Sequence, residues 1–476
     1  MVTNMKTKSK ISKKALLVII LATLALLLVP FIVNQFSGKT LLSEESYYHL
    51  RMIDQFKTTG ISGTDLLLDR PYSFNLFHAL PAILGIGKAV IVFIIPVLLG
   101  LISLFLVYLI YRHLDIDKEN LLFGIILLIS APIFIYTFTT VNPESLAFPI
   151  FLLGIYLFLR KNYLSLIMPG ILITINFYAS IILLLVFGIQ TFIEKKGKRI
   201  FIISALFFIL AGVVSVLFLK FSPFLEFVQN GFSLSSLFVT LGGVKGYSLI
   251  VIILAILGMS SFWERDVKWT AWYGIITIFF AGSLFYSSTR IFMLPVIAFF
   301  SGRAISDMVK KHWNISLLKE VTLLLIVCSI LFSAVVFIKS EASSISPENV
   351  NAIKYLSATD PNDVILSSEN NGFLIQEIAK RKTYLDSFSY KYKDYEYREN
   401  ISKGIFYTRN LKELEAVFNK SGINHILIDK NMYAGQIWNS PDEGVLFIFK
   451  NSNSFVKLFD NQDDQIYRFV GKDLKN

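Results

Sequence analysis

The chain has 476 residues, of which 54% are hydrophobic and 17% are charged. Its mean hydropathy of +0.61 excludes an ordinary soluble globular protein. The net charge of +11 does not indicate nucleic-acid binding, because the basic residues lie in short loops between apolar segments, where they act as topology signals. The single cysteine, Cys328, lies in an apolar segment, which excludes a disulfide framework and a metal–thiolate site.

From Ala15 to Ile338 the apolar residues form runs long enough to cross a hydrocarbon core, and after that the chain is polar. We therefore predict a polytopic α-helical membrane domain, residues 1–340, followed by a soluble α/β domain, residues 341–476. The first run follows several lysines, as in a signal peptide, but it is long and lacks a cleavage site, which favours a retained helix. About eleven membrane-spanning segments are expected, at 15–36, 88–111, 120–138, 144–160, 163–176, 178–193, 199–219, 247–263, 269–286, 291–306 and 320–338.

The loops between these segments differ in charge, and the bias puts the N-terminus in the cytoplasm of a cell-membrane protein. With an odd number of segments, the C-terminal domain then lies outside. This count depends on dividing one long apolar run near Asn176, and the charge bias disappears without that division. The basic residues of the cytoplasmic side are Lys6, Lys8, Lys10, Lys13, Lys14, Arg112, Lys118, Arg160, Lys161, Lys195, Lys196, Lys198, Arg199, Arg265, Lys268, Lys310, Lys311 and Lys319. The short loops of the outer side hold Lys220, Lys245 and Arg290.

Four features meet the outer face in this arrangement. They are the long first loop 37–87, the turn 139–144, the stretch 286–290 and the whole C-terminal domain. In the first loop an amphipathic helix is expected near Tyr47–Phe56, lying at the membrane interface. The convergence of polar residues from distant parts of the chain predicts a functional site at this face.

The C-terminal domain is predicted to be α/β. Ser346 is a helix N-cap and is followed by proline at the first helical position. Two short apolar runs bounded by polar residues, 364–366 and 425–428, indicate buried strands. Between them, residues 410–420 have the apolar spacing of a helix.

The acidic residues near the outer face have a functional and a structural interpretation. Glu44 and Glu45 could bind a divalent cation, or they could simply stabilise a helix start. Glu144 could be a metal or substrate ligand together with Asn142, or a first-turn glutamate. Arg290 could hold a phosphate with its guanidinium fork, or snorkel to lipid headgroups.

This set of charges fits a lipid-phosphate substrate better than an ion pathway. A transporter would more often place such charges at mid-bilayer, where this chain has almost none. A cytoplasmic nucleotide-sugar donor is disfavoured, since no glycine-rich phosphate loop is visible. The other histidines are scattered along the chain and do not indicate a site, whereas His49 lies close to the acidic pair Glu44 and Glu45.

Four motifs resemble those of the catalytic subunits of archaeal and bacterial oligosaccharyltransferases, in the GT-C superfamily of membrane glycosyltransferases. Residues 45–51, Glu-Ser-Tyr-Tyr-His-Leu-Arg, resemble the family's D-P-Y-Y-H-x-R signature. Residues 142–144, Asn-Pro-Glu, are similar to its second-loop D-x-D motif. Residues 289–302, Thr-Arg-Ile-Phe to Pro295 and Gly302, resemble its R-R-F…P…G segment. Residues 365–372, with Arg381 and Asp386 downstream, look like its S-W-W-D-Y-G…R…D region.

The resemblance implies a metal-dependent, inverting transfer of a sugar or oligosaccharide from a polyprenyl phosphate or pyrophosphate carrier. Its acceptor would be a protein, a glycan or a lipid, and its metal Mg²⁺ or Mn²⁺. It implies Glu45 as the catalytic residue and metal ligand, with Glu144 and Asn142 completing the metal shell. The implied substrate-binding residues are Arg290, Glu44, Tyr47, His49 and Arg51, and the acceptor-side candidates are Ser368, Glu369 and Asn370.

The departures from the family pattern concern the acceptor. Ser368, Glu369 and Asn370 replace the tryptophan-tryptophan-aspartate that reads the asparagine sequon, and the outer loop 220–246 is short. A glutamate at 45 and an asparagine at 142 replace two aspartates. Two alternatives therefore stay open: an oligosaccharyltransferase acting on protein asparagine, and an inactive scaffold or binding protein with this fold.

Overall fold

The computed structural model describes residues 12–36, 43–194, 197–218, 235–241, 243, 245–261, 267–343 and 345–471. Several positions used for the orientation lie outside these ranges: Lys6, Lys8, Lys10, Lys195, Lys196, Lys220 and Arg265. Most of the loop 220–246 lies outside them as well. The chain divides into two compact units, of which the first combines residues 1–33 with 74–342 and the second combines 34–73 with 343–476.

The expected domains, 1–340 and 341–476, stay a prediction, and the two compact units divide the chain differently. The sequence assigns the first outer loop, 37–87, to the membrane domain, whereas residues 34–73 pack with the C-terminal part of the chain. One physical reason is the buried ion pair between Arg70 of the first loop and Asp386, which are 316 residues apart in sequence. An expectation built on chain order has no means of finding such pairs.

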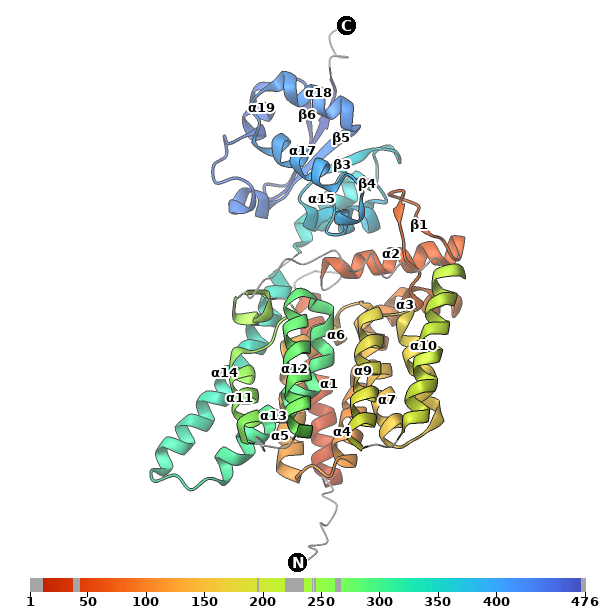
Figure 1. Ribbon diagram of the computed structural model, residues 1–476. Coiled ribbons are helices and arrows are strands. Elements are labelled where there is room, and N and C mark those ends of the chain that lie inside the picture. Colours follow the sequence, from red (N-terminus) through yellow and green to blue (C-terminus); the bar gives the residue numbers. More distant parts are fainter. Residues whose placement is uncertain are drawn as a thin grey trace, which may run out of the picture. The chain divides into compact units, whose positions relative to one another are not determined.

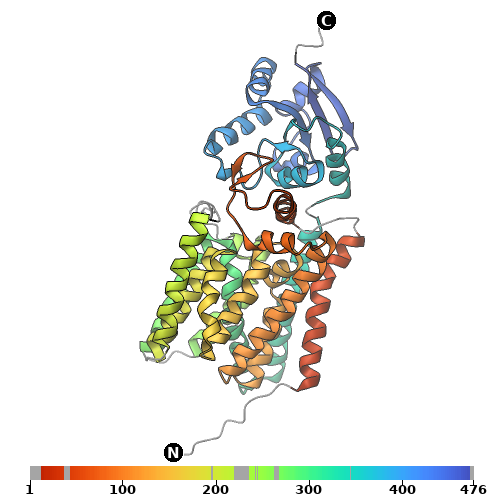
Figure 2. The same ribbon diagram turned by 90° about the vertical axis from the view of Figure 1, so that its right-hand side faces the viewer.

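The first unit is a bundle of helices (Figure 1). Helices α4, α7, α9 and α10 run side by side in both views (Figures 1 and 2). The helices are α1 (Lys13–Phe36, the end of which enters the second unit), α3 (Leu76–Ile83), α4 (Ile95–His113), α5 (Lys118–Ser130), α6 (Pro132–Thr139), α7 (Pro143–Leu159), α8 (Met168–Ile173), α9 (Phe177–Glu194), α10 (Lys198–Phe218), α11 (Leu249–Ser261), α12 (Val267–Phe285), α13 (Arg290–Lys310) and α14 (Ser316–Ser343).

Within the described ranges, five helices are long and apolar enough to cross a membrane, and a sixth crossing results if the bent pair α5 and α6 is one span. They include α1, α10 and α14, together with the helices that run through 90–113 and 287–310. Further apolar helices of 10–17 residues lie at 143–159, 163–173, 177–193, 249–261 and 272–285. Each expected segment thus coincides with an apolar helix or helix pair, while the number of eleven crossings stays a prediction.

The apolar run that we divide near Asn176 is broken in the structure. Helix α8 ends at Ile173 and α9 begins at Phe177. Asn176 accepts a hydrogen bond from the backbone N–H of Ala179 at 2.9 Å, so it caps the start of α9. A second break separates α5 from α6, where Ala131 precedes Pro132 and the axis bends by 56°. Capping and proline chemistry explain both breaks.

Close packing of three helices depends on glycines. A Cβ atom built on Gly302 of α13 would lie 2.6 Å from the backbone nitrogen of Gly124 on α5. A Cβ on Gly258 of α11 would lie 1.9 Å from the carbonyl oxygen of Phe300 on α13. Backbones approach this closely in membrane bundles where small residues face one another. Helix α13 is therefore held between α5 and α11, which fixes the helix that begins with Arg290.

The second unit combines helices with a sheet (Figure 2). In its described part, five strands form a sheet in the order β4-β3-β5-β7-β6, with β3 parallel to β4 and β5, and β7 antiparallel to β5 and β6. A small antiparallel pair, β1 with β2, belongs to the first loop. The elements are α2 (Glu44–Thr59), β1 (Thr64–Asp65), β2 (Arg70–Pro71), α15 (Pro347–Leu356), β3 (Val364–Leu366), α16 (Gly372–Leu374), β4 (Lys382–Thr383), α17 (Tyr395–Tyr407), α18 (Leu411–Ser421), β5 (Ile423–Ile428), α19 (Val445–Asn451), β6 (Phe455–Asp460) and β7 (Gln465–Phe469).

The local predictions for this unit are confirmed. Ser346 accepts a hydrogen bond from the backbone N–H of Asn349 at 3.0 Å and caps α15, which begins at Pro347. The two predicted strands are β3 and β5, and the predicted helix is α18, capped by Asn410. An apolar core that includes Leu366, Ile426 and Trp438 joins the sheet to the helices.

Candidate functional site

Helix α2 carries the predicted first-loop motif and belongs to the second unit. Glu44 and Glu45 form its first turn, where the helix dipole favours carboxylates, and both are half-buried. Ser43, just before the helix, has φ 71°, a backbone conformation that serine rarely adopts. Three further residues of the predicted motif are buried in α2: Tyr47, His49 and Arg51.

Arg51 lies in a buried network of ion pairs. Its two terminal nitrogens donate to Asp65 Oδ1 and Oδ2 at 2.6 and 2.7 Å. Arg70 Nε donates to Asp65 Oδ2 at 3.2 Å, and Arg70 Nη1 donates to Asp386 Oδ1 at 2.7 Å. None of the four residues is more than 5% exposed. The observed contacts of Arg51 are thus structural, and its part in substrate binding stays a prediction.

Two members of the network, Asp65 and Arg70, keep their charges despite burial. Burial opposes the charged form of Asp65, but the hydrogen bonds and charge of Arg51 and the charge of Arg70 outweigh it and hold the pKa of Asp65 below its usual value. Burial likewise opposes the charge of Arg70, yet Asp386 and Asp65 raise the pKa of Arg70 above its usual value. Burial raises the pKa of Tyr48, which faces both guanidinium groups, to about 12. Arg70 and Asp65 therefore stay charged at neutral pH.

The acceptor-side candidates follow strand β3 at its carboxyl end. Ser368 is buried, Glu369 is half-buried and Asn370 is exposed. Burial, reinforced by the negative charge of Glu399, raises the pKa of Glu369 above its usual value. Glu369 therefore holds a proton to a higher pH than an exposed glutamate would.

Two residues of this region are not among the predicted site residues: Asn371, which lies within the motif 365–372, and Asp429, which no motif includes. Asn371 Nδ2 donates to Asp429 Oδ2 at 2.6 Å and to the hydroxyls of Ser367 and Ser368 at 3.0 and 3.2 Å. Asp429 follows β5, the parallel neighbour of β3, so the carboxyl ends of both strands meet here. Polar residues directly after two buried strands were the available signal, because ligands of parallel sheets bind at that edge.

In the first unit, Asn142 caps helix α7. Its side-chain oxygen accepts from the backbone N–H of Ser145 at 2.9 Å. Its Nδ2 donates to Thr140 Oγ1 at 2.7 Å and to the carbonyl of Thr137 at 3.1 Å. The side chain is buried, and these contacts give it a complete structural role. Glu144, in the first turn of α7, is half-buried.

Arg290 begins helix α13 and is 2% exposed. Its Nε donates to the carbonyl of Ser283 at 2.9 Å, and Nη1 donates to the carbonyls of Ser236 and Lys245 at 2.5 and 3.1 Å. Its Nη2 donates to the hydroxyl of Ser236 at 2.8 Å. No carboxylate of the described residues forms an ion pair with Arg290, so its charge is met there by dipoles alone.

The first turn of α13 packs against the second and third turns of α7. The ring of Phe292 lies 6.0 Å from that of Phe148 and 5.1 Å from that of Phe151, centroid to centroid. Glu144 and Arg290 thus begin two neighbouring helices at the same end of the first unit. The predicted residues are divided between the units, with Glu44 and Glu45 in the second.

Among the residues that the structure describes, neither unit alone contains a built metal site. In the described ranges, no three side chains of His, Cys, Asp or Glu gather in a way that would hold a metal ion. Asn142, a predicted ligand, uses its side-chain oxygen to cap α7. The residues of one unit therefore do not fit a divalent cation held by protein side chains only.

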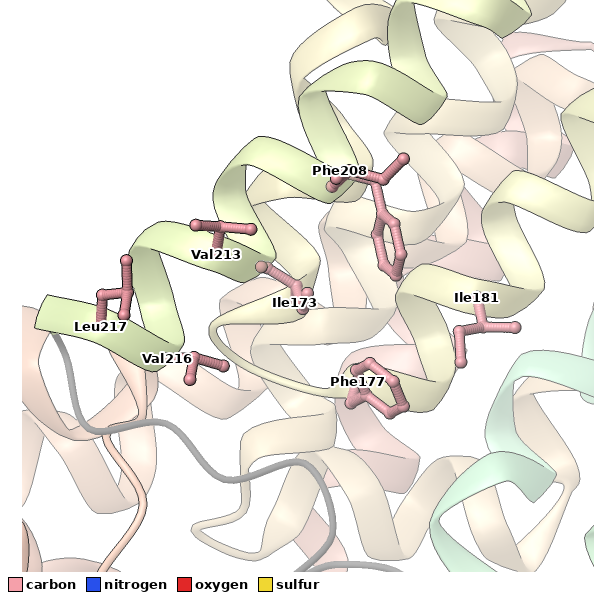
Figure 3. A pocket seen from close by; sticks show the side chains of 9 residues that line it. Ile173, Phe177, Ile181, Phe208, Val213, Val216 and Leu217 are labelled. Atoms are coloured by element: carbon pink, nitrogen blue, oxygen red, sulfur yellow. The ribbon is translucent and has the colours of Figure 1, made fainter.

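An apolar cavity of about 510 Å³ lies between α8, α9 and α10 (Figure 3). Phe177 and Ile181 of α9 line it together with Phe208 of α10. The lining contains no polar side chain, so the cavity suits an apolar molecule and offers no group for chemistry. The remaining lining residues are Ile173, Ile209, Gly212, Val213, Val216 and Leu217.

No protein-family model matches the chain, and no curated protein sequence matches it. Solved structures do. The archaeal oligosaccharyltransferase AglB from Archaeoglobus fulgidus, in complex with an inhibitory peptide and a dolichol-phosphate, has a TM-score of 0.57 at 13% identity, over 87% of this chain and 69% of that one.

Two further solved structures are similar to this chain. ArnT from Cupriavidus metallidurans, bound to undecaprenyl phosphate, has a TM-score of 0.54 at 10% identity, over 96% of this chain and 98% of that one. The arabinofuranosyltransferase AftD from Mycobacteria has 0.56 at 14% identity, over 98% of this chain and 40% of that one. At these identities the likeness concerns the fold, and the chain therefore has the fold of the GT-C glycosyltransferases.

Proposed function

We propose that the chain is a membrane glycosyltransferase that takes a sugar or oligosaccharide from a polyprenyl phosphate or pyrophosphate carrier. It transfers this group to a protein, glycan or lipid acceptor at the outer face of the membrane. The observation that carries the proposal is the likeness of nearly the whole chain to GT-C structures, two of which contain a polyprenyl phosphate. The motif residues at the starts of α2, α7 and α13 support it.

Arg290 is the residue we assign to the carrier phosphate. A buried cation is costly unless an opposite charge or good hydrogen bonds compensate it. Carbonyl dipoles compensate Arg290 partly, and no described carboxylate neutralises it. A phosphate brought to the start of α13 would supply the missing negative charge through a charge-assisted hydrogen bond.

The transfer breaks the bond between the sugar C1 and the carrier phosphate oxygen and forms a bond from C1 to the acceptor atom. The carrier phosphate leaves with the bonding electron pair, and the proton of the acceptor passes to the carboxylate of Glu45 as general base. Arg290 stabilises the negative charge that grows on the leaving phosphate. We propose Glu44, Tyr47, His49 and Arg51 as the residues that line the substrate beside Glu45.

We also propose that a divalent cation, Mg²⁺ or Mn²⁺, takes part, with Glu45 and Glu144 as its protein ligands. Such ions prefer carboxylate oxygens and usually keep waters or a substrate phosphate in their shell. When bound, the ion would supply further positive charge near the leaving phosphate. No step above depends on it.

The test uses the purified full-length chain with a polyprenyl-phosphate-linked sugar and a cell-envelope extract as acceptor source. Release of the carrier lipid is followed by mass spectrometry. We expect Glu45→Gln to reduce release at least 100-fold, because a general base typically contributes that much. Wild-type protein that binds the carrier but never releases it would refute the enzyme and favour a scaffold.

Two arginines of one helix give a matched comparison. Arg290→Lys keeps a charge but loses the fork, and we expect it to weaken binding of polyprenyl phosphate about tenfold. Arg303→Lys, near the other end of α13 and paired with Asp307 and Asp117, should bind normally. Equal binding by both variants would contradict the assignment of Arg290.

A further inference from the structure

The loop 386–389 of the C-terminal part of the chain contacts the first-loop segment with three successive residues. Asp386 Oδ1 accepts from Arg70 Nη1 at 2.7 Å, and Ser387 Oγ donates to Glu44 Oε1 at 3.2 Å. The ring of Phe388 meets the ring of Tyr48 edge to face, with centroids 4.7 Å apart. An ion pair, a hydrogen bond and an aromatic contact thus join the same two segments.

The loop 386–389 is itself rigidly folded around Asp386. The Asp386 backbone N–H donates to Ser389 Oγ at 2.6 Å, while Asp386 Oδ1 accepts from the backbone N–H of Phe388 at 2.9 Å. Asp386 Oδ2 accepts from Gln376 Nε2 at 2.6 Å. Because both carboxylate oxygens are used and the residue is 1% exposed, the loop has little freedom to move alone.

Gly372 makes room for this loop. A Cβ atom on Gly372 would lie 2.3 Å from Cβ and 2.7 Å from Cα of Asp386, and 2.9 Å from the carbonyl oxygen of Leu385. Two of these three neighbours are backbone atoms, which cannot turn aside as a flexible side chain can. Any side chain at 372 therefore has to displace the loop that touches Glu44.

On the other side of the contact, helix α2 is held at its first turn and near its middle. Glu44 is bound at the first turn by Ser387, and Arg51 is bound two turns later by Asp65. Asp65 in turn shares Arg70 with Asp386, so one continuous chain of contacts runs from the loop 386–389 to α2. The strained φ of 71° at Ser43 persists only where such surroundings fix the backbone.

We propose that the loop 386–389 is the positioning device for the α2 carboxylates, with Ser387 and Asp386 as positioning residues and Gly372 as the residue that admits them. The loop sets where Glu44 and Glu45 stand, so a segment far from the first loop in sequence controls the residue assigned as general base. The inference rests on the proposed function for its catalytic meaning, and on the contacts alone for its structural meaning.

Three single variants of the full-length chain test the proposal. Ser387→Ala removes only the contact to Glu44, and Gly372→Ala pushes the loop. Gly404→Ala is the matched control, because a Cβ there, in helix α17 of the same unit, meets nothing within 4 Å. Hydrogen–deuterium exchange of residues 44–50 and kcat and KM for the lipid-linked sugar are measured on each.

We expect Ser387→Ala and Gly372→Ala to speed exchange at the start of α2 about tenfold and to lower kcat about tenfold, with KM for the donor unchanged. Losing a hydrogen bond to a charged group typically produces an effect of about this size. Gly404→Ala should change neither quantity. If Gly372→Ala fails to fold, the exchange and kinetic results for Ser387→Ala alone test the proposal.

The outcomes separate the two proposals. Unchanged exchange in α2 for Ser387→Ala overturns the positioning role, whatever happens to activity. Faster exchange throughout the second unit, in place of a change confined to α2, also overturns it. A wild-type protein without sugar transfer would refute the proposed function, while the exchange of residues 44–50 would still decide whether the loop positions α2.

Discussion

At the scale of single residues, Asn142 shows how a motif position can serve the backbone. The sequence pattern suggests an acid replaced by an amide in a metal-binding pair. In the structure the amide is needed as an amide, since its oxygen accepts from Ser145 and its nitrogen donates to the carbonyl of Thr137 and the hydroxyl of Thr140. An aspartate can reproduce only the first of these contacts.

We therefore expect Asn142→Asp to destabilise the protein by about 1–3 kcal/mol, although it restores the acid of the family pattern. A carboxylate oxygen would face the buried carbonyl of Thr137 with no proton to donate. Asn162→Asp is the control, because Asn162 caps an exposed turn and only its oxygen is used there. Thermal unfolding in detergent measures both. Equal melting temperatures would contradict the role of the Asn142 amide as a hydrogen-bond donor.

Asp464 is a second residue whose surroundings set its chemistry. Burial raises its pKa to about 6, its Oδ1 accepts from Asn349 at 3.3 Å, and its Oδ2 is buried without a hydrogen-bond partner. Because its pKa in the folded state is above the unfolded value, the folded state favours the proton. The associated stability is complete below the unfolded pKa and is lost as the pH rises through about 6.

The Asp464→Asn variant should accordingly become more stable relative to the wild-type protein as the pH rises. Relative to wild type, we expect its melting temperature to increase between pH 5 and pH 8, because the variant has no charge to bury. The comparison is made at fixed ionic strength. A difference that stays constant over this range, or that falls, would show that the buried charge of Asp464 does not limit stability.

Sequence reasoning found the acidic and basic residues of the motifs but not their partners. The resemblance predicts Arg51 as a substrate contact, which stays a prediction, and it gives no hint that the guanidinium binds Asp65. Arg70 and Asp65 carry no motif at all, and Asp386 was identified only within a resemblance. Ion pairs between residues far apart leave no local pattern, so the sequence cannot reveal which carboxylate a given arginine meets.

At the scale of elements, the packing of α13 is the feature open to the sharpest test. Gly302 meets backbone atoms of Gly124, so a methyl group at 302 has no space and no flexible neighbour to displace. We expect Gly302→Ala to cost about 1–3 kcal/mol through overpacking. Gly274→Ala in α12 is the control, because a Cβ there meets nothing within 4 Å. Similar melting temperatures for the two variants would refute the close contact.

Elements with strong local signals could be predicted. The strands β3 and β5 are short apolar runs, and α15 and α18 have capping residues at their starts. The strands β6 and β7 escaped prediction for a physical reason. Strand β6 lies at the edge of the sheet and buries only Phe455 fully, so its sequence lacks the apolar alternation that marks a half-buried strand.

At the scale of the whole molecule, the charge bias of the loops predicts that residue 12 lies in the cytoplasm and residue 442 outside. Cys328 is the only cysteine, so Cys328→Ser gives a background for labelling. We expect a membrane-impermeant maleimide to label Asp442→Cys on intact cells, and to label Ser12→Cys only after permeabilisation. Both positions are exposed in the structure. The reverse pattern would invert the proposed orientation.

The division into two compact units cannot be predicted from the order of the segments along the chain. The sequence predicts apolar helices up to 338, which the structure contains, and an α/β domain after them. Whether residues 34–73 join one or the other depends on contacts such as Arg70 with Asp386, and these link positions 316 residues apart. Only the three-dimensional structure shows which unit residues 34–73 belong to.

That separation has a consequence for how the protein is made. At about 5–20 residues per second, a ribosome needs roughly 15–60 s to synthesise Asp386 after Arg70. Throughout this interval Arg51, Asp65 and Arg70 have been translated without the carboxylate that completes their network. The second unit can therefore close only after Asp386 has been translated, and in a nascent chain halted before Asp386 the first-loop segment would lack the carboxylate that pairs with Arg70.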